Sequence, residues 1–266
     1  MELDPSKYYR MPLIAGAVLD RSNLKIAYPK VETLAFQYLT DPEAIAELLP
    51  DCYHPGKEPM VTVIFSQNNG LSFMAGSGYR LATFQVSAYF DGKQDHVEGD
   101  YILVMFENQT WPIIGGREDL GVPKLFADIP EIKMMPDGHI RGQASYWGHF
   151  LFCLDAFPMK RQTAIARLVA SRQINSRPWL AYKYIPSLDG PPDAEYPTIT
   201  HNDIKLEKLW KGKKASLIFG TGRSEDIGHV KPLLDALASL TIIRPVQVVH
   251  FTGSATLRYD QSRRLR

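Results

Sequence analysis

Cysteine, long apolar runs and an excess of one charge sign are scarce or absent in this 266-residue chain. Its two cysteines, Cys52 and Cys153, are too few for a disulfide framework. No stretch approaches the roughly 18 apolar residues of a membrane helix, and the first residues lack the apolar run of a secretory signal. We therefore expect a reduced, cytoplasmic protein that does not associate with membranes.

The charge balance and the histidine spacing exclude further classes of function. Thirty basic residues against 29 acidic ones create no field that would attract nucleic acid. The seven histidines show neither HxH nor HExxH spacing, so we expect no metal site. Gly220-Thr-Gly222 lacks the third glycine and the following long helix of a nucleotide-binding loop. We interpret it as a surface turn and expect no cofactor.

The pattern along the chain is that of one β-rich domain over residues 1–266. We expect residues 1–36 to be irregular, because prolines interrupt them at Pro5, Pro12 and Pro29. Asp41 before Pro42 is typical of a capped helix start, and the alternating residues 81–90 predict a strand. About three helices among many short strands, without a regular βαβ rhythm, indicate an α+β fold with a largely antiparallel sheet.

One lysine stands in a rigid, apolar phrase, GGREDLGVPKLFADIP, which runs from Gly115 to Pro130. Pro123 fixes the backbone directly before Lys124, and Leu125 follows it. An amine held among apolar groups loses its proton more readily than one in water, and a neutral lysine attacks carbonyl carbons. The phrase therefore predicts imine chemistry, at the end of a buried strand that we expect to run through residues 111–114.

The phrase resembles the GRE…PK phrase of the acetoacetate decarboxylase family, with the same five positions from glutamate to proline. GDYILVMFENQ before it and the RP…KYIP segment from Arg177 to Pro186 after it are similar too, so the resemblance covers nearly the whole chain beyond residue 38. It implies a barrel-like fold with outer helices and homo-oligomers. It also implies a Schiff base between Lys124 and a small keto acid or other carbonyl substrate.

The chain also departs from the family pattern around this lysine. Leu125 stands where the decarboxylases carry a second lysine. Leu81, or Gln85 by a second alignment, stands where they carry an active-site acid. Their N-terminal arginine has no counterpart in this sequence, and Val31 is only the nearest residue by count. Loss of the second cation removes one cause of amine activation. Leu125 is expected to compensate by adding apolar surface beside the amine, because burial disfavours a charged lysine.

These observations favour a Schiff-base-forming carbon–carbon lyase of the aldolase-dehydratase or decarboxylase type. In this interpretation Lys124 forms the imine and Glu118 is the acid–base group; the expected substrate-binding residues are Gln85, Leu81, Leu125 and Arg117. Weak or absent acetoacetate decarboxylation is expected, because the acid and the second lysine are gone. Three alternatives stay open: a structural ion pair of Glu118 with Arg117 or another arginine, a biosynthetic dehydratase or cyclase on the same fold, and a non-catalytic barrel that binds a small apolar ligand.

Overall fold

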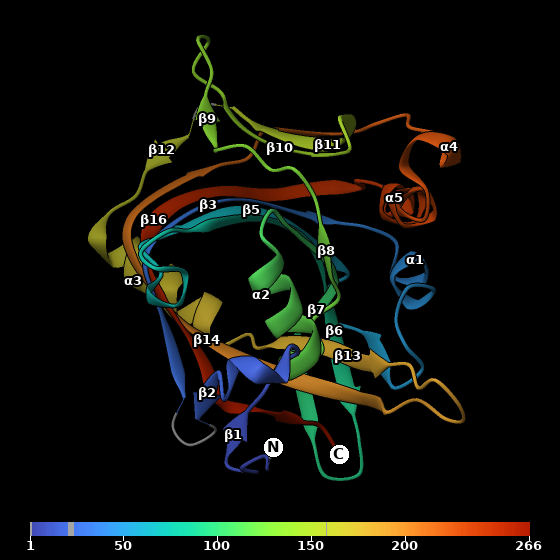
Figure 1. Ribbon diagram of the computed structural model, residues 1–266. Coiled ribbons are helices and arrows are strands. Elements are labelled where there is room, and N and C mark those ends of the chain that lie inside the picture. Colours follow the sequence, from blue (N-terminus) through green and yellow to red (C-terminus); the bar gives the residue numbers. More distant parts are fainter. Residues whose placement is uncertain (1, 21–23, 158) are drawn as a thin grey trace.

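The largest element of the fold is a 10-stranded sheet that closes into a ring (Figure 1). The structure is a computed structural model that describes residues 2–20, 24–157 and 159–266. Around the ring, neighbouring strands follow in the order β6 (Tyr79–Asp91), β5 (Met60–Asn69), β3 (Lys25–Leu39), β16 (Arg244–Arg264), β14 (Ala194–Gly212), β13 (Trp179–Ile185) and β7 (His96–Glu107), which pairs with β6 again. The pairing of β13 with β7 is parallel and the others around the ring are antiparallel. The β-rich, largely antiparallel and barrel-like sheet that the sequence predicted is confirmed.

Short strands extend this sheet, and a second sheet covers one side of it (Figure 1). The additions are β4 (Tyr53–Pro55) beside β6, β12 (Lys160–Arg161) beside β14, and β8 (Lys124–Phe126) beside β7. The second sheet contains β9 (Lys133–Met134), β10 (Ile140–Tyr146), β11 (His149–Ala156) and β15 (Ala215–Phe219). Near the N-terminus, β1 (Lys7–Tyr8) pairs with β2 (Leu19–Asp20).

Helices lie outside the ring and across its opening (Figure 1). They are α1 (Pro42–Ala46), α2 (Thr110–Gly115), α3 (Ala164–Asn175), α4 (Ser224–Ile227) and α5 (Val230–Ser239), with short turns η1 (Leu13–Ala15), η2 (Ser72–Met74) and the π-helical η3 (Gly116–Leu120). The Asp41 side chain caps α1 by accepting from the Glu43 N–H at 2.9 Å, as predicted. In the part of the chain that the structure describes, no helix is both long and apolar enough to cross a membrane.

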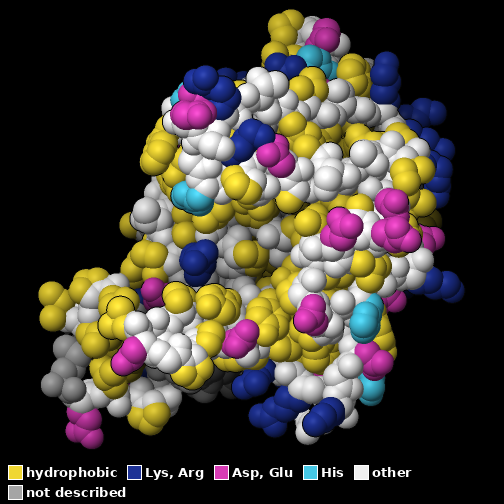
Figure 2. Space-filling view, turned by 90° about the vertical axis from the view of Figure 1, so that its right-hand side faces the viewer, with side chains coloured by type: hydrophobic (Ala, Val, Ile, Leu, Met, Phe, Trp, Pro, Cys, Tyr) yellow, Lys and Arg dark blue, Asp and Glu magenta, His cyan; other side chains and the backbone are white. Residues whose placement is uncertain are grey.

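The main hydrophobic core lies between the ring, the second sheet and α5. Phe65 and Phe84 point outward from the ring into this core, where their rings lie 5.6 and 5.0 Å from the ring of Phe152 on β11. Because side chains alternate along a strand, the intervening residues point into the ring. On the face with α1, α4 and α5, acidic and basic side chains are interspersed (Figure 2), which agrees with the near balance of charge.

Two segments differ from the sequence-based expectation. Residues 25–36, expected to be irregular, belong to β3. Pro29 is tolerated there because the pairing of β3 with β5 ends at Lys30, which leaves Pro29 beside only one neighbouring strand. Residues 111–114, expected as a strand, form α2 instead. The apolar run is too short for its periodicity to distinguish a strand from a helix.

Candidate active site

Lys124 is the first residue of β8, where the strand turns its side chain into the ring. It lies in parallel register with Met105 of β7 and is 8% exposed. Its amine donates to Glu107 Oε1 at 2.7 Å and to the backbone oxygen of Pro112 at 3.0 Å. Leu125, the next residue, packs against the main core on the opposite side of the strand. We expected Leu125 to place apolar surface beside the amine. Because side chains alternate along β8, Leu125 instead points away from the amine.

Two glycines of the GGRE phrase leave space for two cationic side chains, those of Lys124 and Arg10. A Cβ on Gly116 would overlap the side chain of Lys124, and a Cβ on Gly115 would overlap the guanidinium of Arg10. Both glycines lie where α2 continues into the π-helical turn η3. The backbone needs glycine here because two long side chains pass directly over it.

The Lys124–Glu107 pair is buried on both sides. Glu107 has no exposed surface, and its second carboxylate oxygen, Oε2, is buried with no hydrogen-bond partner in the described part of the chain. Burial raises the pKa of the Glu107 carboxyl above its ordinary value, while the charge and hydrogen bond of Lys124 act in the opposite direction. A carboxylate that is costly to keep charged is a proton acceptor for the adjacent ammonium. The geometry therefore provides an amine with its own acid–base partner.

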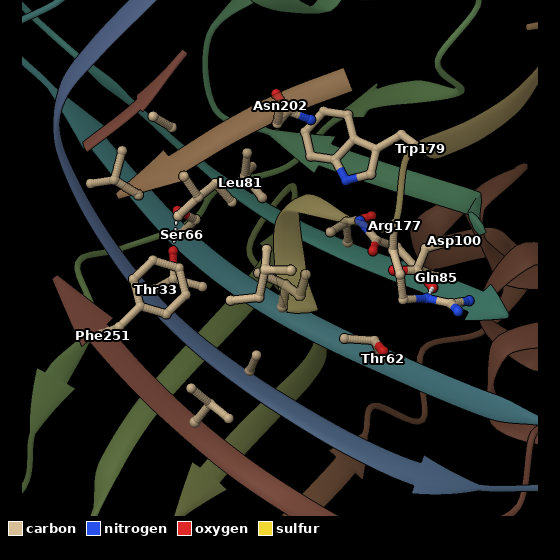
Figure 3. Close-up of a pocket in the computed structure, with 18 of the residues that line it drawn as sticks. Thr33, Thr62, Ser66, Leu81, Gln85, Asp100, Arg177, Trp179, Asn202 and Phe251 are labelled. Carbon is tan, nitrogen blue, oxygen red and sulfur yellow. Dashed lines mark hydrogen bonds and ion pairs between the residues drawn. The ribbon is translucent and has the colours of Figure 1, made fainter. Parts of the chain in front are cut away.

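A large cavity, which we call the main cavity, lies inside the ring and reaches Lys124. It has a volume of about 520 Å³. Figure 3 shows Leu81 and Phe251 toward one end, and Gln85 with the ion-paired Asp100 and Arg177 toward the other. A smaller outer cavity of about 270 Å³ lies on the other side of the lysine. The two share four lining residues: Tyr28, Leu120, Lys124 and Leu257.

The structure brings some of the sequence-predicted residues together and separates others. Leu81, Gln85 and Lys124 all line the main cavity, and so does Val31. Three other candidates lie elsewhere: Arg117, Glu118 and Leu125. Arg117 is exposed and donates to the backbone oxygen of Lys124 at 3.1 Å.

Glu118 lies on the turn η3, beside the site but not in the wall of either cavity as the described residues form it. Its backbone oxygen accepts a hydrogen bond from the amine of Lys183. The structure therefore gives Glu118 no contact with the Lys124 amine. The open alternative, an ion pair of Glu118 with Arg117 or another arginine, does not occur within 4 Å among the described residues.

Sequence reasoning missed two groups beside the lysine. Glu107 is the last residue of the apolar strand β7, and an acid at the end of an apolar strand is visible in the sequence. Only the register between β7 and β8 shows that Glu107 lies beside Lys124. Arg10, 6% exposed, forms a buried ion pair with Asp119, which also accepts from the Tyr259 hydroxyl at 3.3 Å. Arg10 and Tyr259 line the outer cavity. No local pattern links Arg10 to a residue 109 positions away.

Comparisons with known proteins agree with this architecture. The family model described as acetoacetate decarboxylase (ADC) matches residues 10–263. Acetoacetate decarboxylase 1 of Bradyrhizobium diazoefficiens is 28% identical over 228 residues, which are 85% of this chain and 82% of that protein. Acetoacetate decarboxylase 1 of Mesorhizobium japonicum is 27% identical over 253 residues, 94% of this chain and 92% of that protein.

Solved structures share the fold at low sequence identity. Acetoacetate decarboxylase from Legionella pneumophila superposes with a TM-score of 0.74 at 23% identity, covering 100% of this chain and 96% of that one. The enduracididine biosynthesis enzyme MppR, complexed with pyruvate, gives a TM-score of 0.72 at 17% identity, covering 99% and 98%. With the family match spanning nearly all of the sequence, this chain belongs to the acetoacetate decarboxylase family.

Proposed function

We propose that this protein is a Schiff-base-forming carbon–carbon lyase that acts on a keto acid or a related carbonyl compound. The observation that carries the proposal is the buried Lys124 amine, which is hydrogen-bonded to Glu107 and reaches a cavity. Family membership supports a lyase. MppR, which shares the fold, has been solved with pyruvate and with the condensation product of pyruvate and imidazole 4-carboxaldehyde.

In the proposed reaction, Glu107 takes the acid–base role that the sequence suggested for Glu118. The Glu107 carboxylate accepts a proton from the Lys124 ammonium, and the neutral amine attacks the substrate carbonyl carbon. A proton then moves from nitrogen to the former carbonyl oxygen, which gives a carbinolamine. Protonated Glu107 returns its proton to the carbinolamine hydroxyl, which leaves as water. The product is an iminium on Lys124 beside an ionised Glu107.

In decarboxylation the iminium accepts the electron pair of the breaking carbon–carbon bond, and the resulting enamine is protonated on carbon. In aldol chemistry the iminium becomes an enamine by losing a proton from the adjacent carbon to a base, and the enamine attacks an aldehyde, after which the new hydroxyl leaves as water. In both cases water then hydrolyses the iminium, which releases the product and the Lys124 amine. Val31, Leu81 and Gln85, which the resemblance places nearest to the decarboxylases' arginine and acid, line the cavity and carry no charge. Because of this uncharged wall, we expect acetoacetate decarboxylation to be slower than about 10 per second, the rate of a typical enzyme.

Reductive trapping tests the proposal. Incubation with pyruvate or acetoacetate and cyanoborohydride should add the reduced adduct to a peptide that contains Lys124, and Lys124→Met should abolish the adduct. Lys133→Ala, which removes an exposed lysine on β9, is the matched control and should trap at the normal rate. A label on Lys183 instead of Lys124 would contradict the assignment. Release of carbon dioxide then distinguishes decarboxylation from aldol chemistry.

The family resemblance also supports a cytoplasmic homo-oligomer. The helix α3 exposes three apolar side chains on its surface: Ile165 (78% exposed), Leu168 (55%) and Val169 (48%). An exposed apolar helix face of this kind is typical of a subunit contact. Light scattering on the purified protein measures the mass; a mass of 30.0 kDa, that of one chain, would contradict this part of the proposal.

A further inference from the structure

The wall of the main cavity is built from rows of inward-facing residues that are in register across four strands. The row nearest the lysine contains Val249, Ala35, Ile64 and Thr83, with Met105 and Lys124 completing it. On one side of it lies a row of Phe251, Thr33, Ser66 and Leu81, which continues to Glu107. On the other side lies a row of Gln247, Gln37, Thr62 and Gln85, which we call the glutamine row.

Most polar groups of this wall already have partners within the protein. The Thr33 and Ser66 hydroxyls are 2.9 Å apart and hydrogen-bonded (Figure 3). The Thr83 hydroxyl donates to the backbone oxygen of Val104 at 2.8 Å. Hydroxyls that are already hydrogen-bonded within the protein need no partner from a ligand. These rows therefore present an essentially apolar surface to the cavity.

The glutamine row contains a buried donor that lacks a partner within the described chain. Gln247 Nε2 donates to Gln37 Oε1 at 2.6 Å, and Gln37 Nε2 donates to the Thr62 hydroxyl at 3.2 Å. Gln85 is 2% exposed, and its Nε2 is buried without a hydrogen-bond partner among the residues that the structure describes. Such a donor costs free energy unless a ligand supplies an acceptor. Arg177 at this end is already paired with Asp100 at 2.8 Å, so its charge does not call for an anionic ligand group. Lys211 also lines the cavity, but on β14 beside Val249 and not beside Gln85.

The distance between the rows sets the size of the substrate. Adjacent rows are two residues apart along a strand, or about 7 Å. The Lys124 side chain points toward Glu107, away from the glutamine row, so its amine lies roughly 7 to 13 Å from that row. A four-carbon chain with bonds of about 1.5 Å spans less than about 5 Å. A cavity of 520 Å³ also belongs to the size class that encloses drug-sized ligands.

We propose that the substrate is a keto compound with an extended, mostly apolar tail and an uncharged hydrogen-bond acceptor that binds Gln85 at the far end. The inference rests on the proposed function only for the position of the reacting carbonyl at Lys124. Acetoacetate and pyruvate are too short to fill the site, and bind poorly for that reason.

The test is a series of straight-chain 2-oxo acids from pyruvate to 2-oxodecanoate, with an analogue of equal length that ends in a methyl ester. The concentration for half-maximal trapping should fall about two- to fourfold per added methylene until the cavity is full. The ester should bind about tenfold better than the alkyl chain, and Gln85→Leu should remove this preference. Ala35→Phe should raise the concentration of 2-oxodecanoate for half-maximal trapping at least tenfold. Ala46→Phe, on the exposed surface of α1, should leave this concentration unchanged.

Calorimetry on Lys124→Met measures tail binding without imine formation and separates the two proposals. If keto acids are trapped but longer chains do not bind better, the proposal of a long substrate is wrong and the lyase proposal is unaffected. Chain-length-dependent binding to Lys124→Met, without trapping by the natural sequence, supports the tail site and overturns the lyase. Loss of both signals overturns both.

Discussion

Replacing Glu107 by glutamine removes the proton acceptor of the proposed reaction while keeping a side chain of the same shape. Two unit charges 2.7 Å apart attract by about 6 kcal/mol at an effective dielectric near 20. The penalty for burying each ion is also several kcal/mol. Burial therefore narrows the free-energy gap between the ionised and neutral forms of the Lys124–Glu107 pair, which makes proton exchange easier than between the same groups in water. Glutamine can accept the hydrogen bond but cannot take the proton.

We expect Glu107→Gln to slow trapping of Lys124 at pH 7 by about 10²- to 10⁴-fold, the usual contribution of general acid–base catalysis. In the natural pair, proton exchange is internal, so the trapping rate should be nearly independent of pH between the apparent pKa values of the pair. In the variant the proton must leave to solvent, and the rate should rise about tenfold per pH unit.

The assay is intact mass against time, with a keto acid and cyanoborohydride, at several pH values. Glu131→Gln, on an exposed carboxylate that pairs with Arg80 and not with Lys124, is the matched control and should behave as the natural sequence does. Thermal unfolding verifies that both variants are folded. If Glu107→Gln traps within tenfold of the natural rate at pH 7, Glu107 is not the base.

Three further outcomes are expected. Gly116→Ala should abolish trapping in a folded protein, because its Cβ would occupy the space of the Lys124 side chain; normal trapping would refute this packing. Leu125→Lys should lower the free energy of unfolding in urea by about 2 kcal/mol or more, because the leucine packs against the core. The midpoint of the pH profile of trapping should shift by less than about one pH unit. A shift of about two pH units would show that residue 125 contacts the amine. Arg263 and the Arg266 N–H lower the pKa of Asp95 to about 2, so its stabilising effect is complete above pH 4 and disappears toward pH 2. Asp95→Asn should therefore flatten the loss of stability between pH 4 and 2 in urea titrations, and an unchanged slope would contradict the assignment.

The sequence by itself determined the features that depend on neighbouring residues. Period-two alternation over residues 81–90 placed Leu81 and Gln85 on one face of a strand, and both line the main cavity. The cap on α1 was readable because Asp41 bonds two residues ahead. The Lys124 phrase stood out because proline and glycines restrict the backbone locally.

Only the tertiary structure decided what surrounds the lysine. The contact with Glu107 depends on parallel pairing between β7 and β8, and Arg10 reaches Asp119 across 109 positions. Alternation within β8 turned Leu125 toward the core, although the sequence placed it next to the amine. The glutamine row, which ends at Gln85, exists only because four strands are in register. Local propensity acts over a few residues, whereas register and packing depend on the closure of the whole ring, which no short stretch encodes.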